Sequence, residues 1–226
     1  MWAYRNIPIT AFFVAVSFGV CAEDLLDKPL IVVGDTWTFL EQTKTVGVGD
    51  PARDEWKYQI TERRGEQFVM QGSHKGAPDT SELLMTDGLN LLKNGTATYT
   101  PEMRRFDWPL SVGKKWPTKY TYPRSDGGEG TNDFVCTAVA WEDVQVPGGK
   151  FKSLRIDCGG LWSARGGKYT DDSTRERNFS GKSELTYWYA PDARYFVKMR
   201  NVSYLSNGRL NFDSVRELAT YELQKP

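Results

Sequence analysis

The stretch Thr131–Cys158 alternates apolar and polar residues with a period of two, which is the pattern of β-strands that bury one face. A short turn around Val146–Gly148 separates the two halves, and its glycine suits the left-handed backbone that a three-residue hairpin turn needs. The residues that share the predicted buried face are Cys136, Ala138, Ala140, Val144 and Val146 on one strand and Leu154, Ile156 and Cys158 on the other. The pattern predicts a long antiparallel hairpin.

The two cysteines indicate the register of this hairpin. Placing Cys136 opposite Cys158 gives three further pairs that match in character: Ala138 with Ile156, Ala140 with Leu154, and Glu142 with Lys152. A shift of one residue would move the cysteines to opposite faces. We therefore expect a structural disulfide between Cys136 and Cys158, with two buried free thiols as the alternative. Phe151 breaks the alternation, and we expect it at a bulge or over the turn.

Most of the remaining chain also has strand character, and turn signals such as Asp87-Gly88, Asn94-Gly95 and Asn207-Gly208 separate the segments. The other predicted strands are Thr36–Val46, Asp54–Arg63, Gln67–Gln71, Ser81–Met85, Leu89–Lys93, Ala97–Thr100, Lys115–Tyr122, Ser183–Ala190, Tyr195–Leu205 and Leu210–Leu223. This spacing predicts an all-β fold: a single large curved antiparallel sheet, either an open half-barrel or a meander, with few or no helices. The charged stretch Ser163–Lys182 is expected to be a long loop, either a solvated surface loop or a lid that contacts a partner.

The N-terminus has the features of a secretory signal. Arg5 precedes the uncharged apolar run Ile7–Val20, and Val20-Cys21-Ala22 supplies small residues for cleavage after Ala22. We expect residues 1–22 to be a signal peptide and residues 23–226 to form one β-rich domain, periplasmic or secreted. The alternatives are an outer-membrane lipoprotein modified at Cys21 and an uncleaved anchor. The run is shorter than the roughly 20 residues that span a bilayer as a helix.

Charge and cysteine content limit the function classes. The chain has 29 basic and 29 acidic residues, and removal of residues 1–22 takes away one arginine and no acid, which leaves a net charge of −1. A chain without net positive charge has no long-range attraction for nucleic acid. No second apolar stretch is long enough to cross a membrane. The cysteine pair agrees with an oxidising compartment.

Four segments carry a family resemblance: GDTWTF (34–39), WPLSVGKKW (108–116), VQVPGGKFKSLRI (144–156) and TYWYAPDARYFVKMR (186–200). They resemble a loose group of bacterial exported β-rich proteins of unknown function, with patterns such as P-L-x-x-G-x-x-W, V-P-x-G-x-F and W-Y-x-P followed by V-K. The resemblance implies a periplasmic protein with a large curved antiparallel sheet, and it brings no catalytic residues. The architecture is also similar, by distant analogy, to the open half-barrels of periplasmic lipoprotein carriers.

The sequence contains few candidates for catalysis or metal binding. His74 is the single histidine and is expected in a surface loop, so neither a His/Cys metal cluster nor a catalytic triad is predicted, and no cofactor motif is present. Asp171-Asp172 is expected to be solvated. The acids Asp126, Glu129 and Asp133 do not match a known calcium loop. Paired carboxylates for glycoside hydrolysis remain an alternative because acids are plentiful.

Aromatic residues are the stronger signal. Seven of the eight tryptophans lie beyond residue 22, and Thr186–Tyr189 places aromatic side chains on both faces of one strand. The stretch Arg104–Arg124 interleaves cations with rings, an arrangement that can hold a glycan or an anionic lipid head. The residues predicted to contact a ligand are Trp108, Trp116, Tyr120, Tyr187, Trp188 and Tyr189.

These patterns favour a non-enzymatic envelope protein that binds a lipid or another hydrophobic small molecule on the concave face of its sheet. One alternative is a structural or protein-partner module of the envelope, with Ser163–Lys182 as its contact. The other is a carbohydrate hydrolase that uses Asp or Glu.

Overall fold

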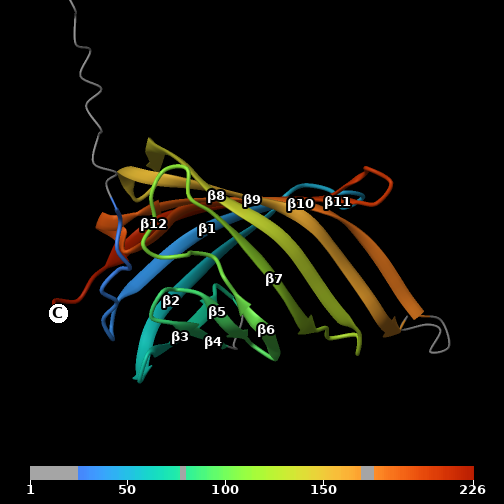
Figure 1. Ribbon diagram of the computed structural model, residues 1–226, viewed down its shortest axis with the longest axis horizontal. Helices are drawn as coiled ribbons and strands as arrows, with labels where there is room; N and C mark the ends of the chain where they lie inside the picture. Colours follow the sequence, from blue (N-terminus) through green and yellow to red (C-terminus); the bar gives the residue numbers. More distant parts are fainter. Residues whose placement is uncertain (1–24, 77–79, 169–175) are drawn as a thin grey trace, which may run out of the picture.

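The computed structural model describes residues 25–76, 80–168 and 176–226, and nearly all of its regular structure is antiparallel strand (Figure 1). A 3-10 helix of three residues, η1 (Pro191–Ala193), is the one helix in these ranges. The strands are β1 (Thr36–Thr45), β2 (Ala52–Arg64), β3 (Gln67–His74), β4 (Thr80–Thr86), β5 (Leu91–Asn94), β6 (Ala97–Met103), β7 (Lys115–Pro123), β8 (Glu129–Val146), β9 (Gly149–Lys168), β10 (Glu176–Ala190), β11 (Tyr195–Leu205) and β12 (Leu210–Glu222).

The sheet closes on itself. Each strand pairs with its neighbours in the chain, and β1 then pairs with β12 along its whole length, from Thr36 opposite Glu222 to Thr45 opposite Phe212. The all-β, antiparallel expectation is therefore confirmed, but the open half-barrel is wrong, because the twelve strands form a closed barrel. The closure buries Trp37 and Phe39 of β1 and Leu218 of β12, which an open edge would leave in water.

A buried carboxylate holds the two ends of the sheet together. Asp35, just before β1, has no exposed surface, and its side chain accepts hydrogen bonds from the backbone N–H of Gln224 at 2.7 Å and of Val32 at 3.0 Å. Arg194, which follows η1, approaches the same carboxylate at 3.3 Å and also donates to the Gln224 carbonyl. Asp35 therefore connects the entry to β1, the exit from β12 and the turn between β10 and β11.

Aromatic side chains fill the end of the barrel where β1 begins and β12 ends. The Trp37 indole N–H donates to the Ala193 carbonyl at 2.8 Å, and its ring centroid lies 5.2 Å from that of Tyr195. Phe106 reaches this region from the β6–β7 connection and packs against Tyr189. This end therefore forms the packed core.

The β8–β9 hairpin has the expected disulfide. Cys136 lies opposite Cys158 and is bonded to it, and Ala138 lies opposite Ile156, as predicted. The rest of the predicted register is wrong, because a bulge between Ala138 and Ala140 shifts the pairing. The observed pairs beyond the bulge are Ala140 with Arg155, Trp141 with Leu154, Glu142 with Ser153 and Asp143 with Lys152.

The bulge also explains the length of the hairpin turn and the position of Phe151. With one extra residue on β8, Val146 pairs with Gly149, so the turn is Pro147-Gly148 and has two residues instead of three. Phe151 pairs with Val144, and both side chains are buried. Phe151 is thus a regular core residue that packs against Tyr221 of β12.

Ser163–Lys182 is not the long loop that its charge suggested. Its first part continues β9 to Lys168 and its last part begins β10 at Glu176, with Ala164 opposite Phe179. Ala164 is buried while Arg165 and Lys182 are exposed, so these two charges lie on the outer face of their strands. Asp171-Asp172 lies outside the described residues.

The predicted signal peptide, its cleavage after Ala22 and the alternative lipid site at Cys21 also lie outside the described residues. Within the described ranges, no helix has both the length and the apolar character needed to span a membrane. His74 lies at the end of β3 rather than in a surface loop.

The disulfide generates a stability prediction. A Cys136→Ala/Cys158→Ala double variant should lose about 3 kcal/mol of unfolding free energy, because the crosslink restricts the unfolded chain between the two positions. Urea unfolding without reductant measures the loss. Reductant should lower the midpoint of the wild-type protein and leave that of the variant unchanged; equal midpoints without reductant would contradict a stabilising crosslink.

Asp35 generates a second stability prediction. Asp35→Ala should lower the unfolding free energy by about 3 kcal/mol, because Arg194 and two backbone N–H groups lose the carboxylate as their acceptor. Asp192→Ala, an exposed carboxylate on η1, is the matched control and should change stability by less than about 0.5 kcal/mol. Thermal unfolding followed by circular dichroism compares them, and equal losses would contradict the role of Asp35 in closing the barrel.

Candidate ligand-binding site

A cavity of about 820 Å³ lies inside the barrel, between the wall β2–β6 and the wall β10–β12. Its volume falls in the range of roughly 300–1,000 Å³ that is usual for small-molecule sites. The apolar and aromatic residues that line it are Trp56, Tyr58, Leu83, Leu91, Tyr99, Met103, Leu185, Tyr187, Tyr195, Phe196 and Met199. The polar residues that line it are Asp54, His74, Thr80, Ser81, Asn94, Arg105, Asn201 and Arg216.

A second chamber of about 270 Å³ extends the first toward the far ends of β8–β10. The two share Met103, Leu185 and Asn201 as lining residues, so the second chamber adjoins the first. Its lining includes the rings of Tyr120, Tyr122, Phe134, Trp162, Phe179 and Phe212. Its polar lining residues are Arg124, which is paired with Asp126, and Asn132, Ser183, Asn201, Ser203 and Asn211. The two chambers together suit a long molecule that is mainly apolar.

Arg216 of β12 enters the first chamber as half of a largely buried ion pair. Its guanidinium lies 2.6 Å from Glu41, and the two side chains are only 18% and 14% exposed. The other guanidinium nitrogen donates to the Tyr58 hydroxyl at 2.9 Å, and Glu41 also accepts a hydrogen bond from Ser214. Glu41 thus neutralises the charge of Arg216 within the wall of the barrel.

Arg105 is the second guanidinium of the chamber, and its environment differs. It is 9% exposed, and its side chain donates to the Tyr195 hydroxyl at 3.0 Å. In the described part of the chain it forms no ion pair. Burial raises the pKa of Tyr187 to about 12 and also raises the pKa of Tyr99, so these neighbouring hydroxyls stay neutral and do not balance the charge.

Several buried polar atoms that line the chamber have no hydrogen-bond partner in the protein. Among the described residues seven such side-chain atoms occur, and four belong to residues of this chamber: Trp56 Nε1, Arg105 Nε, Asn201 Oδ1 and Arg216 Nε. Buried polar groups without partners are rare in native proteins, and each one needs an explanation. Three of the four are donors, so the chamber is better suited to an acceptor than to a donor.

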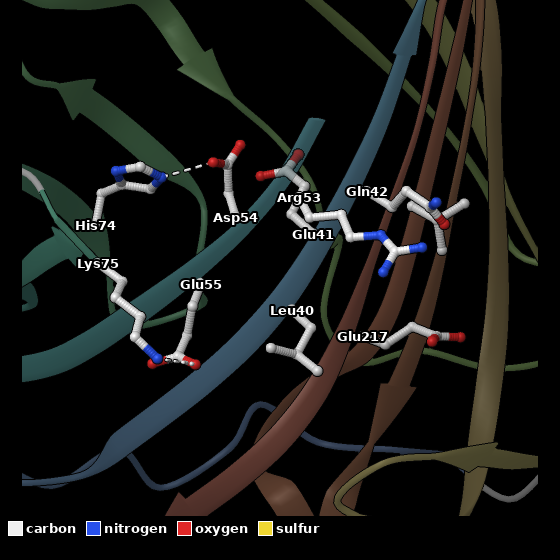
Figure 2. Close-up of a pocket in the computed structure, with 10 residues that line it drawn as sticks. Leu40, Glu41, Gln42, Arg53, Asp54, Glu55, His74, Lys75 and Glu217 are labelled. Carbon is white, nitrogen blue, oxygen red and sulfur yellow. Dashed lines mark hydrogen bonds and ion pairs between the residues drawn. The ribbon is translucent and has the colours of Figure 1, made fainter. Parts of the chain in front are cut away.

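Asp54 and His74 lie at the boundary between the chamber and an outer groove. The His74 ring Nε2 lies 2.7 Å from the Asp54 carboxylate, and both residues line the chamber and a groove of about 420 Å³ next to β1 and β2 (Figure 2). The groove also contains the Lys75–Glu55 ion pair. Its charged lining distinguishes it from the aromatic chamber inside.

The arrangement around His74 offers little for catalysis. Ser81 lines the same chamber, but the structure contains no hydrogen bond between Ser81 and His74, as a triad would require. Asp54 is the single acid among the described residues that line the chamber, whereas glycoside hydrolysis uses two carboxylates. No group of three or more metal-binding side chains occurs among the described residues.

The six aromatic residues predicted to contact a ligand are distributed over three environments. Tyr187 lines the first chamber and Tyr120 the second. Trp108, Trp116 and Tyr189 belong to or pack against the core at the filled end of the barrel. Trp188 lies on the outer face, where its indole N–H donates to Glu142 at 2.8 Å.

The prediction missed most residues of the chamber, including Trp56, Tyr58, Tyr195 and Arg216, and it also missed Glu41, the partner of Arg216. A signal for Glu41 was present, because Trp37, Phe39 and Glu41 share one parity on β1, which places an acid on the buried face. An acid on such a face needs a cation nearby. The sequence pattern does not identify Arg216 as that cation, because the pairing of β1 with β12 is not encoded locally.

No family model matches the chain, and no curated protein matches it. Among solved structures, a candidate lipoprotein from Parabacteroides distasonis is 12% identical with a TM-score of 0.49, covering 88% of this chain and 100% of its own. A candidate exported protein with a YmcC-like fold from Bacteroides fragilis is 14% identical with a TM-score of 0.49, covering 88% and 99%. The hypothetical lipoprotein YmcC from Escherichia coli is 13% identical with a TM-score of 0.42, covering 84% and 85%. Likeness at this level assigns neither a function nor site residues to the chain.

The buried ion pair generates a prediction. Glu41→Gln should lower the unfolding free energy by about 3 kcal/mol, because Arg216 would keep its charge without a counter-ion. The double variant Glu41→Gln/Arg216→Met should recover much of this loss. Urea unfolding of the single and double variants gives the coupling energy. Asp213→Asn, which breaks the more exposed Arg200–Asp213 pair of β11 and β12, is the control and should cost less than about 1 kcal/mol. If Glu41→Gln lowers the unfolding free energy as little as Asp213→Asn does, the Glu41–Arg216 pair is not important for stability.

Proposed function

We propose that this protein is a non-enzymatic binding protein of the bacterial envelope that holds a lipid-like hydrophobic molecule inside its barrel. The observation that carries the proposal is the internal space of two adjoining chambers, with a first chamber of about 820 Å³ lined by aromatic and aliphatic side chains. Burying apolar ligand surface against such a lining contributes roughly 25 cal/mol per Å². Because packed aromatic side chains fill one end of the barrel, a ligand would enter the internal space at another point.

The location in the envelope rests on the sequence. The signal-like N-terminus and the cysteine pair support export to an oxidising compartment, with either cleavage after Ala22 or lipid attachment at Cys21. Both routes place the barrel in the same surroundings, where free fatty acids, lysolipids and other amphiphiles occur. A binding protein with a closed interior would shield such molecules from water.

The two alternative functions receive less support. The protein-partner hypothesis rested on Ser163–Lys182 as a long contact loop, and most of that segment is strand. The hydrolase hypothesis needs two carboxylates at one site, and Asp54 is the single acid among the described lining residues of the first chamber. Neither alternative explains the size of the internal space.

Filling the chamber tests the proposal. Ser81 and Glu82 are neighbours on β4; Ser81 lines the chamber opposite Gly72, whereas Glu82 pairs with Lys93 and is not a lining residue. Ser81→Trp should weaken binding of a dansyl-labelled undecanoic acid by at least about tenfold, because the indole occupies the ligand's space. Glu82→Trp places the same side chain on the other face and should bind within about twofold of wild type.

Fluorescence titration measures the affinity of the probe for wild type and the two variants, and circular dichroism verifies that each protein is folded. Native mass spectrometry of freshly purified protein should also show a co-purified mass that Ser81→Trp lacks. If the probe binds Ser81→Trp as tightly as wild type, or binds neither protein, the proposed function is wrong.

A further inference from the structure

We infer that the ligand carries one oxyanion head, a carboxylate or a phosphate ester, which Arg105 binds at the inner end of the first chamber while the ligand's chain extends toward the second. This inference rests on the proposed function and adds the chemical class of the ligand to it.

The charge balance of the chamber supports an anion. A buried guanidinium is usually paired, because desolvation of an uncompensated charge is very unfavourable. Arg216 follows this rule through Glu41, whereas Arg105 forms no ion pair among the described residues and donates to the Tyr195 hydroxyl. An oxyanion of the ligand would give Arg105 the counter-ion that the protein does not provide.

The hydrogen-bonding geometry also supports an anion. One nitrogen of Arg105 donates to Tyr195, and its Nε is buried without a partner. A guanidinium offers donors in a planar fork that fits the two oxygens of a carboxylate or phosphate. Trp56 Nε1 lines the same chamber as a further donor without a partner. The unused hydrogen-bonding capacity therefore consists mainly of donors, as an oxyanion requires.

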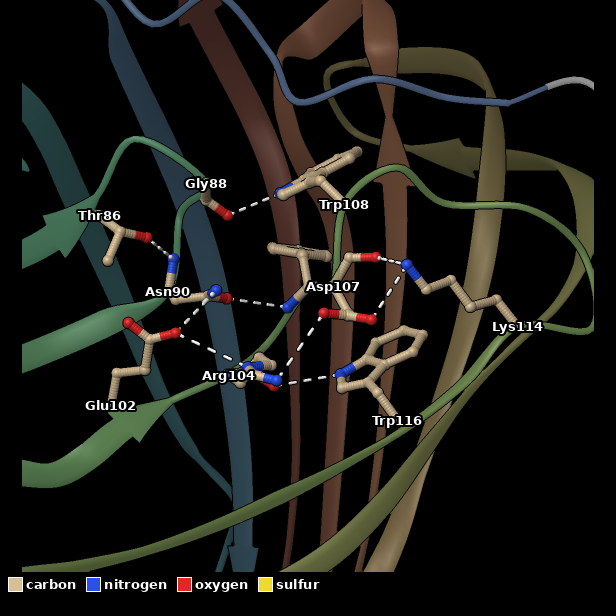
Figure 3. Close-up of polar contacts among 10 residues, drawn as sticks. Thr86, Gly88, Asn90, Glu102, Arg104, Asp107, Trp108, Lys114 and Trp116 are labelled. Atoms are coloured by element: carbon tan, nitrogen blue, oxygen red, sulfur yellow. Dashed lines mark hydrogen bonds and ion pairs between the residues drawn. The ribbon is translucent and has the colours of Figure 1, made fainter. Parts of the chain in front are cut away.

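Two side chains fix the backbone on either side of Arg105: Trp116 of β7 and Asn90 from the turn between β4 and β5, whose contacts are drawn in Figure 3. The Trp116 indole N–H donates to the Arg104 carbonyl at 3.3 Å, and the Phe106 N–H donates to the Asn90 side chain at 3.0 Å. Asn90 is buried and is itself held by Thr86, whose hydroxyl accepts its backbone N–H at 3.1 Å. Arg105 is thus held in place before a ligand arrives, which is how binding sites limit the entropy lost on association.

The position of Arg105 sets the direction of the ligand. Arg105 precedes Phe106 and contacts Tyr195, which both belong to the packed core that fills one end of the barrel. Met103 and Leu185 line both chambers, whereas Arg105 lines only the first. A head bound at Arg105 therefore leaves the chain of the ligand to run past Met103 and Leu185 into the aromatic second chamber.

Ligands with one chain and different heads test the inference. Dodecanoate, dodecyl phosphate and dodecanol share the same alkyl chain, and isothermal titration below their aggregation limits measures their affinities. Wild type should bind the preferred anion about 10- to 100-fold more tightly than dodecanol, as expected for a charge-assisted hydrogen bond. The stronger of the two anions identifies the head as carboxylate or phosphate.

Variants then assign the preference to Arg105. Arg105→Met should remove the advantage of the anion and leave dodecanol affinity within about threefold, whereas Arg105→Lys should retain part of it. Arg104→Met is the matched control: it removes the same charge from the adjacent residue, whose side chain is exposed and does not line the chamber, and should keep the anion preference. Circular dichroism verifies that each variant is folded.

The outcomes separate the two proposals. If dodecanol binds wild type as well as both anions do, the protein binds amphiphiles but the head is not an oxyanion, and only this inference fails. If Arg105→Met keeps the anion preference, Arg105 is not the anchor. If none of the three ligands binds, the proposed function fails with it. If Arg105→Met does not fold, the affinities of the three ligands for wild type and for Arg105→Lys still test the inference.

Discussion

The pairing of the first strand with the last is the constraint on which the rest of this structure depends. Once β1 and β12 pair along their length, the sheet has an inside and an outside, and every second residue of each strand faces an enclosed space. The carboxylate of Asp35 secures this closure by accepting backbone hydrogen bonds from the segments at both termini of the sheet. Without the closure, Glu41 and Arg216 would lie on separate edges and could not form their ion pair.

Closure alone does not produce a binding site, because a barrel can be filled by its own side chains. Here Trp37, Phe106 and Tyr189 pack together at one end, whereas other rings line the two chambers. Gly72, opposite Ser81, has no side chain, and the Tyr58 ring of the first chamber packs closely against its backbone. The same barrel thus has a solid end that gives stability and a hollow part that can hold a ligand.

The sequence predicted what depends on local pattern and missed what depends on distant pairing. The Cys136–Cys158 register followed from alternation and a shared face, but the bulge after Ala138 was hidden because small apolar residues continue the pattern through it. Ser163–Lys182 was interpreted as a loop because charged residues dominate its composition, although the buried Ala164 pairs with Phe179 within the sheet. Closure was missed because the pairing of β1 with β12 joins the two ends of the chain.

The candidate site was also missed where it depends on contacts between distant parts of the chain, and Arg105 is the clearest case. In the sequence Arg105 is one of several cations interleaved with rings between Arg104 and Arg124, and most cations in such a stretch extend into water. The fold turns this one inward, because Asn90 and Trp116 fix the backbone beside it. A wholly apolar ligand would leave its guanidinium without a counter-ion, and a ligand with many charges would meet the rings that line the second chamber beyond Met103. A molecule with one anionic end and a long apolar remainder satisfies both parts of the space, and this is the physical reason to seek the ligand among single-headed amphiphiles.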